Sequence, residues 1–341
     1  MEATTLFEKL TSMSEAELLE FIKDSEDFSS TQIQSYLDYI YDKAAPLDLG
    51  MELYDCCGTG GDGSNTFNIS TTAAIIAASC GIKICKNGGR SSSSSTGSVD
   101  VLEALGLNLA ASLEQKIHGL GQTNLAFYSS TVSAELLAPI KQICRKAKLT
   151  SFLSLIGPLA SPVVLEGQVI GVAKEKWLPI IVDLERSLIE QGKRQKAIIV
   201  ISEFTDGTKV DEITSASKSK IILVNQSSKI EFDFDAKDLD LHGNKEDLAG
   251  GKDHQENAAI INTILRHCEP KGRGNPDKAL NSKINTACLS SALLTYLDSN
   301  ACTDNYNEFI DLLNPYFEQA NKAVYSNKAY ENFETLKTVY K

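Results

Sequence analysis

The sequence lacks the features that mark membrane-bound, secreted or nucleic-acid-binding proteins. No apolar run approaches the roughly 20 residues that a membrane-spanning helix needs. No stretch near the start joins a basic region to a short apolar run, as a secretory signal does. Lysine and arginine number 33 against 45 aspartate and glutamate, and the net charge of −12 disfavours polyphosphate backbones and anionic membranes. We therefore expect a cytoplasmic protein without a membrane or nucleic-acid partner.

The eight cysteines form no C-x-x-C pair. They are scattered along the chain, and several lie in segments rich in alanine or isoleucine. This distribution predicts reduced thiols in a protein core rather than disulfides or a zinc site. The cysteines are Cys56, Cys57, Cys80, Cys85, Cys144, Cys268, Cys288 and Cys302.

Short β-type runs alternate with alanine- and leucine-rich helical runs over most of the 341 residues, which predicts an α/β fold. Ser14 with Glu17 and Ser29 with Gln32 match the capping-box spacing, so two short helices open the chain. The β-type runs lie at 52–54, 82–85, 168–172, 197–201 and 221–224, and later helical patterns at 284–297 and 306–320.

Three segments rich in glycine and hydroxyl groups lie between residues 55 and 106. The first, at 55–63, follows a β-type run and precedes a helical stretch from Thr71, an order that suits phosphate binding at a helix N-terminus. The second, at 68–72, places Ser70 or Thr71 to cap that helix. The third, at 86–106, offers two cations and many hydroxyls. Alone, the first could be a tight turn and the second a simple cap, but together the three indicate a multiply phosphorylated ligand that brings its own metal.

A fourth segment, at 206–213, carries Asp211 and Glu212 after a buried-strand pattern. Carboxylates are ligands that Mg²⁺ prefers, together with water and substrate phosphate. Adjacent residues of a strand face opposite ways, so both can serve one ion only from a loop, or they serve two ions. Taken alone, this segment is more typical of a solvated acidic turn. The four histidines show no ligand spacing, and they are His118, His242, His254 and His267.

In unbroken order from about residue 50 to 295, these segments resemble the successive signatures of the anthranilate phosphoribosyltransferase family. The matching segments are Asp55 with 58–62, 68–71, 86–106, 157–159, 211–213, 256–258 and 284–287. The resemblance implies a small α-helical N-terminal domain over 1–48, joined by part of 130–155. It also implies a larger α/β domain over 49–341, with a central sheet flanked by helices.

The activity implied by the resemblance is Mg²⁺-dependent transfer of a phosphoribosyl group from phosphoribosyl pyrophosphate to an aromatic amine, with release of pyrophosphate. Anthranilate is the first choice of acceptor, which places the protein in tryptophan biosynthesis, and the expected assembly is a homodimer. Catalysis then consists of positioning and metal stabilisation of the leaving group, without a covalent enzyme nucleophile.

By the same resemblance, each site residue receives a role. Pyrophosphate is wrapped by Gly58, Thr59, Gly61 and Asp62. Phosphate and ribose oxygens are held by Asn68, Ser70, Thr71, Lys86 and Ser98. One Mg²⁺ is bound by Ser70, and the other by Asp211 with Glu212.

The departures from the family lie on the acceptor side. Where the family has Lys-His-Gly-Asn-Arg, this chain has Asn87 in place of the histidine and Gly89 in place of the asparagine. A second family histidine falls near Thr131, and the arginine that pairs with the anthranilate carboxylate has no clear counterpart. Lys141 fits when counted from Pro139, whereas the count back from Gly157 ends near Cys144, beside Arg145. Lysine is a poorer carboxylate ligand than a bidentate arginine. The expected acceptor contacts are Asn87, Gly89, Lys141 and Arg145.

Three alternatives stay open at the level of sequence. The same donor chemistry could serve a different aromatic or heterocyclic acceptor, which an assay with other amines would reveal. A non-catalytic binding homologue would bind nucleic acid at physiological salt, although the intact Asp62, Lys86, Asp211 and Glu212 argue against it. A nucleoside phosphorylase of the same fold would cleave pyrimidine nucleosides with phosphate.

Overall fold

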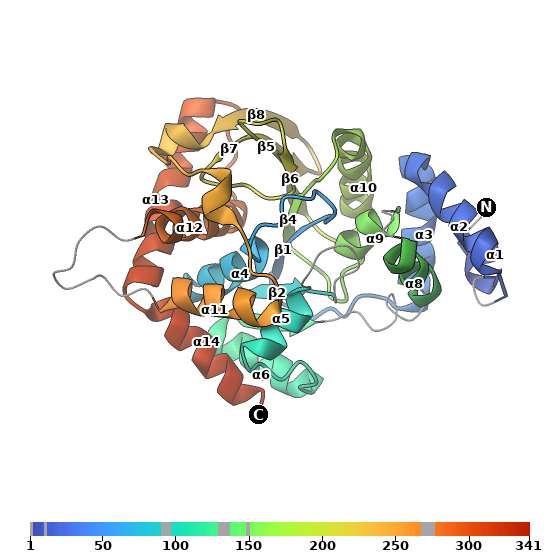
Figure 1. Ribbon diagram of the computed structural model, residues 1–341, viewed down its shortest axis with the longest axis horizontal. Helices are drawn as coiled ribbons and strands as arrows, with labels where there is room; N and C mark the ends of the chain where they lie inside the picture. Colours follow the sequence, from blue (N-terminus) through green and yellow to red (C-terminus); the bar gives the residue numbers. More distant parts are fainter. Residues whose placement is uncertain (1–2, 10–11, 90–96, 129–136, 148–150, 267–276) are drawn as a thin grey trace.

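The computed structural model describes residues 3–9, 12–89, 97–128, 137–147, 151–266 and 277–341. Within these ranges, eight strands form one sheet (Figure 1). They are β1 (Tyr54–Gly58), β2 (Ile84–Asn87), β3 (Leu125–Tyr128), β4 (Gly167–Gly171), β5 (Lys196–Phe204), β6 (Lys209–Val210), β7 (Ser217–Asn225) and β8 (Lys229–Asp235). The order across the sheet is β3, β2, β1, β4, β5, β7 and β8, and β6 pairs with β5 outside this row.

The five strands from β3 to β5 in this row are mutually parallel, whereas β7 and β8 are antiparallel to their neighbours. Because parallel strands end at one edge, β1, β2 and β4 bring Gly58, Asn87 and Gly171 to the same side of the sheet. Ligands of open α/β sheets bind outside this carboxyl edge. The fold therefore gathers three distant segments where a ligand site is expected.

Helices cover both faces of the sheet, as Figure 1 shows. One face packs against α4 (Ile69–Ser79), α5 (Ser98–Ala104), α11 (His254–Leu265), α12 (Lys278–Asp298), α13 (Tyr306–Tyr325) and α14 (Lys328–Val339), with α6 (Leu113–Thr123) beside α14. The other face is covered by α10 (Leu178–Glu190), and α9 (Leu153–Leu159) belongs to the same core. Beyond these two helices lie α3 (Ser30–Lys43), which packs on α10 and α9, and α2 (Glu15–Asp24), which packs on α8 (Ala138–Ala147), with α1 (Ala3–Lys9) against α3. In β5, Ile198 and Val200 join the first core while Ile199 and Ile201 join the second, as the period of a strand requires.

The two predicted helices at the start of the chain are confirmed as α2 and α3. Both predicted capping boxes are present, at Ser14 and at Ser29. The helices α2 and α3 share an aromatic cluster with the segment before α9, where the ring centres of Tyr36 and Phe152 lie 4.8 Å apart. Ile140, Ile143 and Phe152 thus belong to the same core as the N-terminal helices. The domain boundary at residue 48 and the homodimer stay predictions.

The β-type runs and the late helices were predicted correctly, with shifted ends. The first strand begins at Tyr54, at the end of the predicted run, and continues to Gly58, so it includes four residues, 55–58, that were assigned to the glycine loop. The following helix begins at Ile69, and Ser70 and Thr71 therefore lie in its first turn rather than at its cap position, which Asn68 occupies. No helix of the described residues is long and apolar enough to cross a membrane.

One prediction about the cysteines was wrong. The seven described cysteines are free thiols, and Cys56, Cys85, Cys144 and Cys288 are buried as expected. Cys302 is exposed instead, because α12 ends at Asp298 and the chain turns across the surface before α13. Cys268 lies outside the described residues.

Candidate donor and metal site

The loop after β1 is a glycine turn anchored to β4. Gly60 and Gly61 both have positive φ, 71° and 79°, a conformation that glycine adopts without strain. Between them and the strand, the Thr59 amide donates to the Gly171 carbonyl over 2.9 Å, and the Thr59 hydroxyl accepts from the Ala173 amide over 3.0 Å. The predicted glycine loop is confirmed, and its first residues are fixed to the strand beside it.

Asp62 is held at the far end of this loop. Its carboxylate accepts from the Ser64 amide over 3.2 Å and from the Ser64 hydroxyl over 2.6 Å. The Asp211 amide donates to the same carboxylate over 3.4 Å. These contacts bring the loop of residues 58–64 against the loop that follows β6, although 149 residues separate Asp62 from Asp211.

Asp211 and Glu212 lie in a loop, not in a strand, directly after β6. The Asp211 carboxylate accepts from the Gly60 amide. The Glu212 carboxylate accepts from the Ser70 amide, in the first turn of α4, over 3.3 Å. The two adjacent carboxylates therefore both reach the space between the glycine loop and the first turn of α4. Because they lie in a loop, they meet the condition for serving one metal ion.

Two glycines make room for Asp211 at the ends of β1 and β4. A Cβ atom on Gly171 would lie 1.6 Å from the Asp211 carbonyl oxygen, and one on Gly58 would lie 2.2 Å from its carboxylate oxygen. Gly58 was predicted to belong to the site, but Gly171 was missed. The only signal for Gly171 in the sequence is that a β-type run contains a glycine near its end, as the strand that ends at Gly58 also does.

Lys86 is the buried cation of this site. It is 2% exposed, and its ammonium donates to the Cys56 carbonyl and, over 3.4 Å, to the Ser70 hydroxyl. Burial by itself opposes the charge, but the surrounding acidic groups, including Asp55 and Glu212, outweigh it and raise the pKa of Lys86. Lys86 therefore stays charged beside the first turn of α4.

The carboxylates of the site repel one another. Burial raises the pKa of Asp211 well above its usual range, and the neighbouring Asp62 and Glu212 raise it further. Burial also raises the pKa of Glu212 to about 7, although Lys86 opposes this shift. Such crowded negative charge favours a bound cation.

The donor set fits Mg²⁺ that also contacts a phosphorylated substrate. Among the described residues, no group of three or more His, Cys, Asp or Glu side chains forms a complete metal site. Mg²⁺ needs fewer protein ligands, because it commonly binds one or two carboxylates and keeps water and phosphate oxygens. In addition, the buried side-chain oxygen of Asn68 has no hydrogen-bond partner among the described atoms.

The remaining predicted donor residues lie around the same edge. Thr71 is buried in the first turn of α4. Ser98 is the first residue of α5, and its hydroxyl donates to the Gly89 carbonyl over 3.5 Å. Gly88 allows the segment after β2 to lie close to the start of α5, since a Cβ there would lie 2.5 Å from the Ser98 hydroxyl oxygen.

The acceptor side is described only in part. Asn87 ends β2, and its amide group donates to the carbonyls of Gly157 and Ala160, over 3.5 and 3.4 Å. Lys141 and Arg145 belong to α8, and their side chains lie outside the described residues, as do Thr131 and the stretch 90–96. Among the described residues, none lies within 4 Å of a Cβ placed on Gly89.

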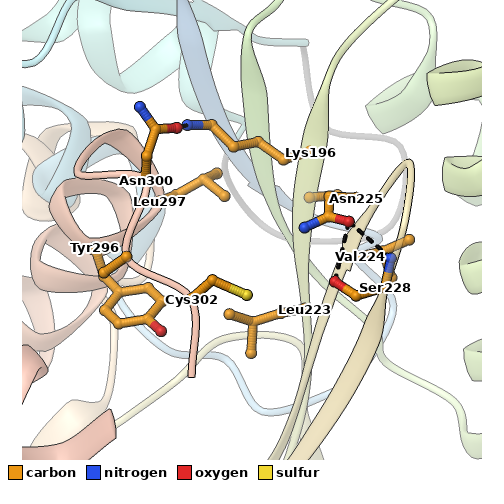
Figure 2. Close-up of a pocket in the computed structure, with 11 residues that line it drawn as sticks. Lys196, Leu223, Val224, Asn225, Ser228, Tyr296, Leu297, Asn300 and Cys302 are labelled. Atoms are coloured by element: carbon orange, nitrogen blue, oxygen red, sulfur yellow. Dashed lines mark hydrogen bonds between the residues drawn. The ribbon is translucent and has the colours of Figure 1, made fainter. Parts of the chain in front are cut away.

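A separate pocket lies at the opposite edge of the sheet (Figure 2). Lys196, at its rim, is the first residue of β5 and pairs with Gly167, the first residue of β4. The pocket is therefore at the amino edge of the parallel strands, where Tyr296 and Cys302 approach from α12 and the turn after it. It shares no residue with the site at the carboxyl edge.

The raised pKa of Glu212 predicts a stability effect that depends on pH. The folded chain holds this proton more tightly than the unfolded chain, whose glutamate has a pKa near 4.5, so stability falls as the pH rises from about 4.5 to 7. Glu212→Gln removes the buried charge and should raise the melting temperature at pH 8 by roughly 2–4 °C. Calorimetry in EDTA should find little difference from the wild type at pH 5. A lower melting temperature of the variant at pH 8 would show that Lys86 and α4 stabilise the Glu212 carboxylate by more than burial of its charge costs.

Comparisons with known proteins agree with this geometry. Residues 50–303 match the model of the glycosyl transferase family, a/b domain. An anthranilate phosphoribosyltransferase of Clostridium kluyveri is 32% identical over 295 residues, which cover 86% of this chain and 79% of the relative.

Two solved structures have the same fold. That of anthranilate phosphoribosyltransferase from Thermus thermophilus has a TM-score of 0.76 at 22% identity and covers 99% of this chain and 94% of its own. That of the Saccharomyces cerevisiae enzyme in complex with PRPP and Mg has a TM-score of 0.73 at 21% identity and covers 92% and 80%. The chain therefore belongs to the anthranilate phosphoribosyltransferase family, within the glycosyl transferases that share this α/β domain.

Proposed function

We propose that this protein transfers the phosphoribosyl group of phosphoribosyl pyrophosphate to anthranilate and releases pyrophosphate, as a step of tryptophan biosynthesis. One observation carries the proposal: the glycine loop, Lys86 and the two loop carboxylates Asp211 and Glu212 meet at one edge of the sheet. The names of the relatives support the same activity.

The donor binds where amides and cations converge. The backbone of the glycine loop, with Gly58, Thr59, Gly61 and Asp62, would surround the pyrophosphate. The first turn of α4, with Asn68, Ser70 and Thr71, would offer amides and hydroxyls to phosphate and ribose oxygens, since a helix N-terminus favours anions. Lys86 and Ser98 would complete this side.

Asp211 and Glu212 would hold one Mg²⁺, and Ser70 would contribute to a second. When bound, Mg²⁺ neutralises charge that builds on the departing pyrophosphate. The amine nitrogen forms a bond to the ribose C1 as the bond from C1 to the pyrophosphate oxygen breaks. Pyrophosphate keeps the bonding electrons, and the amine loses a proton. The protein contributes alignment of the two reactants, which can lower the barrier by several kcal/mol.

On the acceptor side, we infer that Asn87 and Gly89 line the amine pocket and that Lys141 or Arg145 pairs with a carboxylate. The glycine at position 89 favours a second candidate, in which the same donor chemistry serves a different aromatic or heterocyclic acceptor, since no described residue lies within 4 Å of a Cβ placed there. The family resemblance and the donor side support both candidate functions equally.

The test is the loss of anthranilate fluorescence when the purified protein is mixed with phosphoribosyl pyrophosphate and Mg²⁺. We expect a loss that depends on both additions, with pyrophosphate formed in equal amount. If the fluorescence persists while calorimetry detects donor binding, anthranilate is not the acceptor, and other aromatic amines are assayed by pyrophosphate release. Failure of every amine would refute a transferase acting on this class.

A further inference from the structure

A buried ion pair lies beneath the acceptor side. Arg194, just before β5, and Glu185, in α10, are both fully buried. The Arg194 Nη1 atom lies 2.9 and 3.1 Å from the two carboxylate oxygens of Glu185. Taking two charges out of water is costly, and further hydrogen bonds are needed to offset it. For Arg194, those further bonds reach Gln168 and α9.

The end of α9 is bound by this ion pair and by its neighbour in β4. Arg194 Nη2 donates to the Leu159 carbonyl over 2.9 Å, and Nη1 donates to the Gln168 side-chain oxygen. Gln168 in turn donates to the Pro158 carbonyl over 2.9 Å. The last carbonyls of a helix have no partner inside the helix, so donors placed here determine where its end lies.

The same end of α9 is linked to the donor side. Asn87 donates to the carbonyls of Gly157 and Ala160, as described above. The Gln168 amide also lies 3.3 Å from the Cys57 sulfur in β1, just before the glycine loop. Side chains from β2, from β4 and from the segment before β5 therefore hold four consecutive residues, 157–160.

The N-terminal helices join the same point. The Tyr41 hydroxyl, at the end of α3, donates to the Leu159 carbonyl over 2.7 Å and accepts from the Ser161 amide over 3.2 Å. The Leu159 carbonyl thus receives bonds from both Tyr41 and Arg194. Cys144 of α8 donates to the Ser151 hydroxyl over 3.5 Å, and that hydroxyl accepts from the amide of Leu153, the first residue of α9, over 3.2 Å. A shift of α9 would therefore move the helix that carries Lys141 and Arg145.

We propose that Arg194 and Gln168 are positioning residues that hold α9, and through it α8, at a fixed distance from the donor loop. This proposal rests on the proposed function. Neither side chain needs to touch a substrate, because each acts through the backbone of residues 157–160. Their loss should therefore impair use of the acceptor, while the phosphate-binding loop keeps its own anchors at Gly171 and Ala173.

The kinetic test compares two variants. Gln168→Met keeps the volume nearly constant and removes the amide's bonds to Pro158, Cys57 and Asp55, together with the oxygen that accepts from Arg194. Arg194→Lys keeps the charge but not the planar fork. We expect the KM for the acceptor to rise about tenfold or more, with the KM for phosphoribosyl pyrophosphate within about twofold of the wild type. The matched control is Ser202→Ala, which breaks the buried 2.6 Å hydroxyl pair with Ser219 between β5 and β7. It should lower stability without changing either KM. Equal changes in both KM values, or none, would overturn the proposal.

A second measurement does not depend on the identity of the acceptor. Hydrogen exchange of the wild type and Gln168→Met is followed in peptides covering residues 153–161 and 217–225. We expect exchange in 153–161 to be about tenfold faster in the variant, with 217–225 unchanged. Unchanged exchange in 153–161, or a uniform rise in both peptides, would show that Gln168 does not hold α9 in place, even if the enzyme were active. If the wild type did not use anthranilate, the proposed function would be wrong. The exchange result would still show whether Gln168 holds α9 in place.

Discussion

Replacing Asp211 and Glu212 together with alanine is expected to abolish transferase activity, with kcat/KM falling by about 10³-fold or more. Both carboxylates reach the same region from one loop, and metal stabilisation of a leaving group is worth several kcal/mol. The measurement is pyrophosphate release at saturating Mg²⁺. The variant relieves repulsion among buried carboxylates. Its melting temperature without metal should therefore not fall, although its activity is lost.

The matched control removes the same charge far from the site. Glu231→Ala with Asp233→Ala changes the net charge equally on β8, where both side chains are exposed. We expect its activity to equal that of the wild type. If the Asp211 and Glu212 double variant kept more than about a tenth of wild-type activity, these carboxylates would not be the metal ligands.

The second large effect is expected from a single methyl group. Gly171→Ala places a Cβ 1.6 Å from the Asp211 carbonyl, a backbone atom that cannot move without its loop. The loop must therefore shift, and a displacement of about 1 Å in a catalytic site can reduce the rate by about 10²-fold. Overpacking of this kind also destabilises a fold by about 1–3 kcal/mol. The measurements are kcat/KM and the free energy of unfolding in urea.

Gly121→Ala provides the comparison, since that glycine lies exposed in α6 with nothing within 4 Å of a new Cβ. This variant should keep full activity and gain about 0.4–1 kcal/mol of stability, because alanine favours the helix and restricts the unfolded chain. Near-normal activity of Gly171→Ala would mean that the position of Asp211 is not critical for the reaction.

The amino-acid sequence predicted the backbone elements around the proposed donor site well, because its signals there are local. A strand, a glycine turn and a helix start within residues 54–72 depend on neighbouring residues, and the structure places each where it was expected within a few positions. The two capping boxes at Ser14 and Ser29 are equally local, and both formed. For Asp211 and Glu212, the sequence left two alternatives open, a loop that serves one ion or two separate ions, and the structure places both residues in a loop.

The sequence by itself thus determined the α/β fold class, the order of the elements and the residue types that we propose contact phosphate and metal. The tertiary structure decided which distant residues meet: Asp211 against Gly60, the space that Gly171 provides, and the hold of Arg194 and Gln168 on α9. The physical reason is the pairing of β1 with β4, which brings together segments more than a hundred residues apart. Burial at that junction also raised the pKa of Glu212 to about 7, because removal from water, rather than residue type, determines the charge.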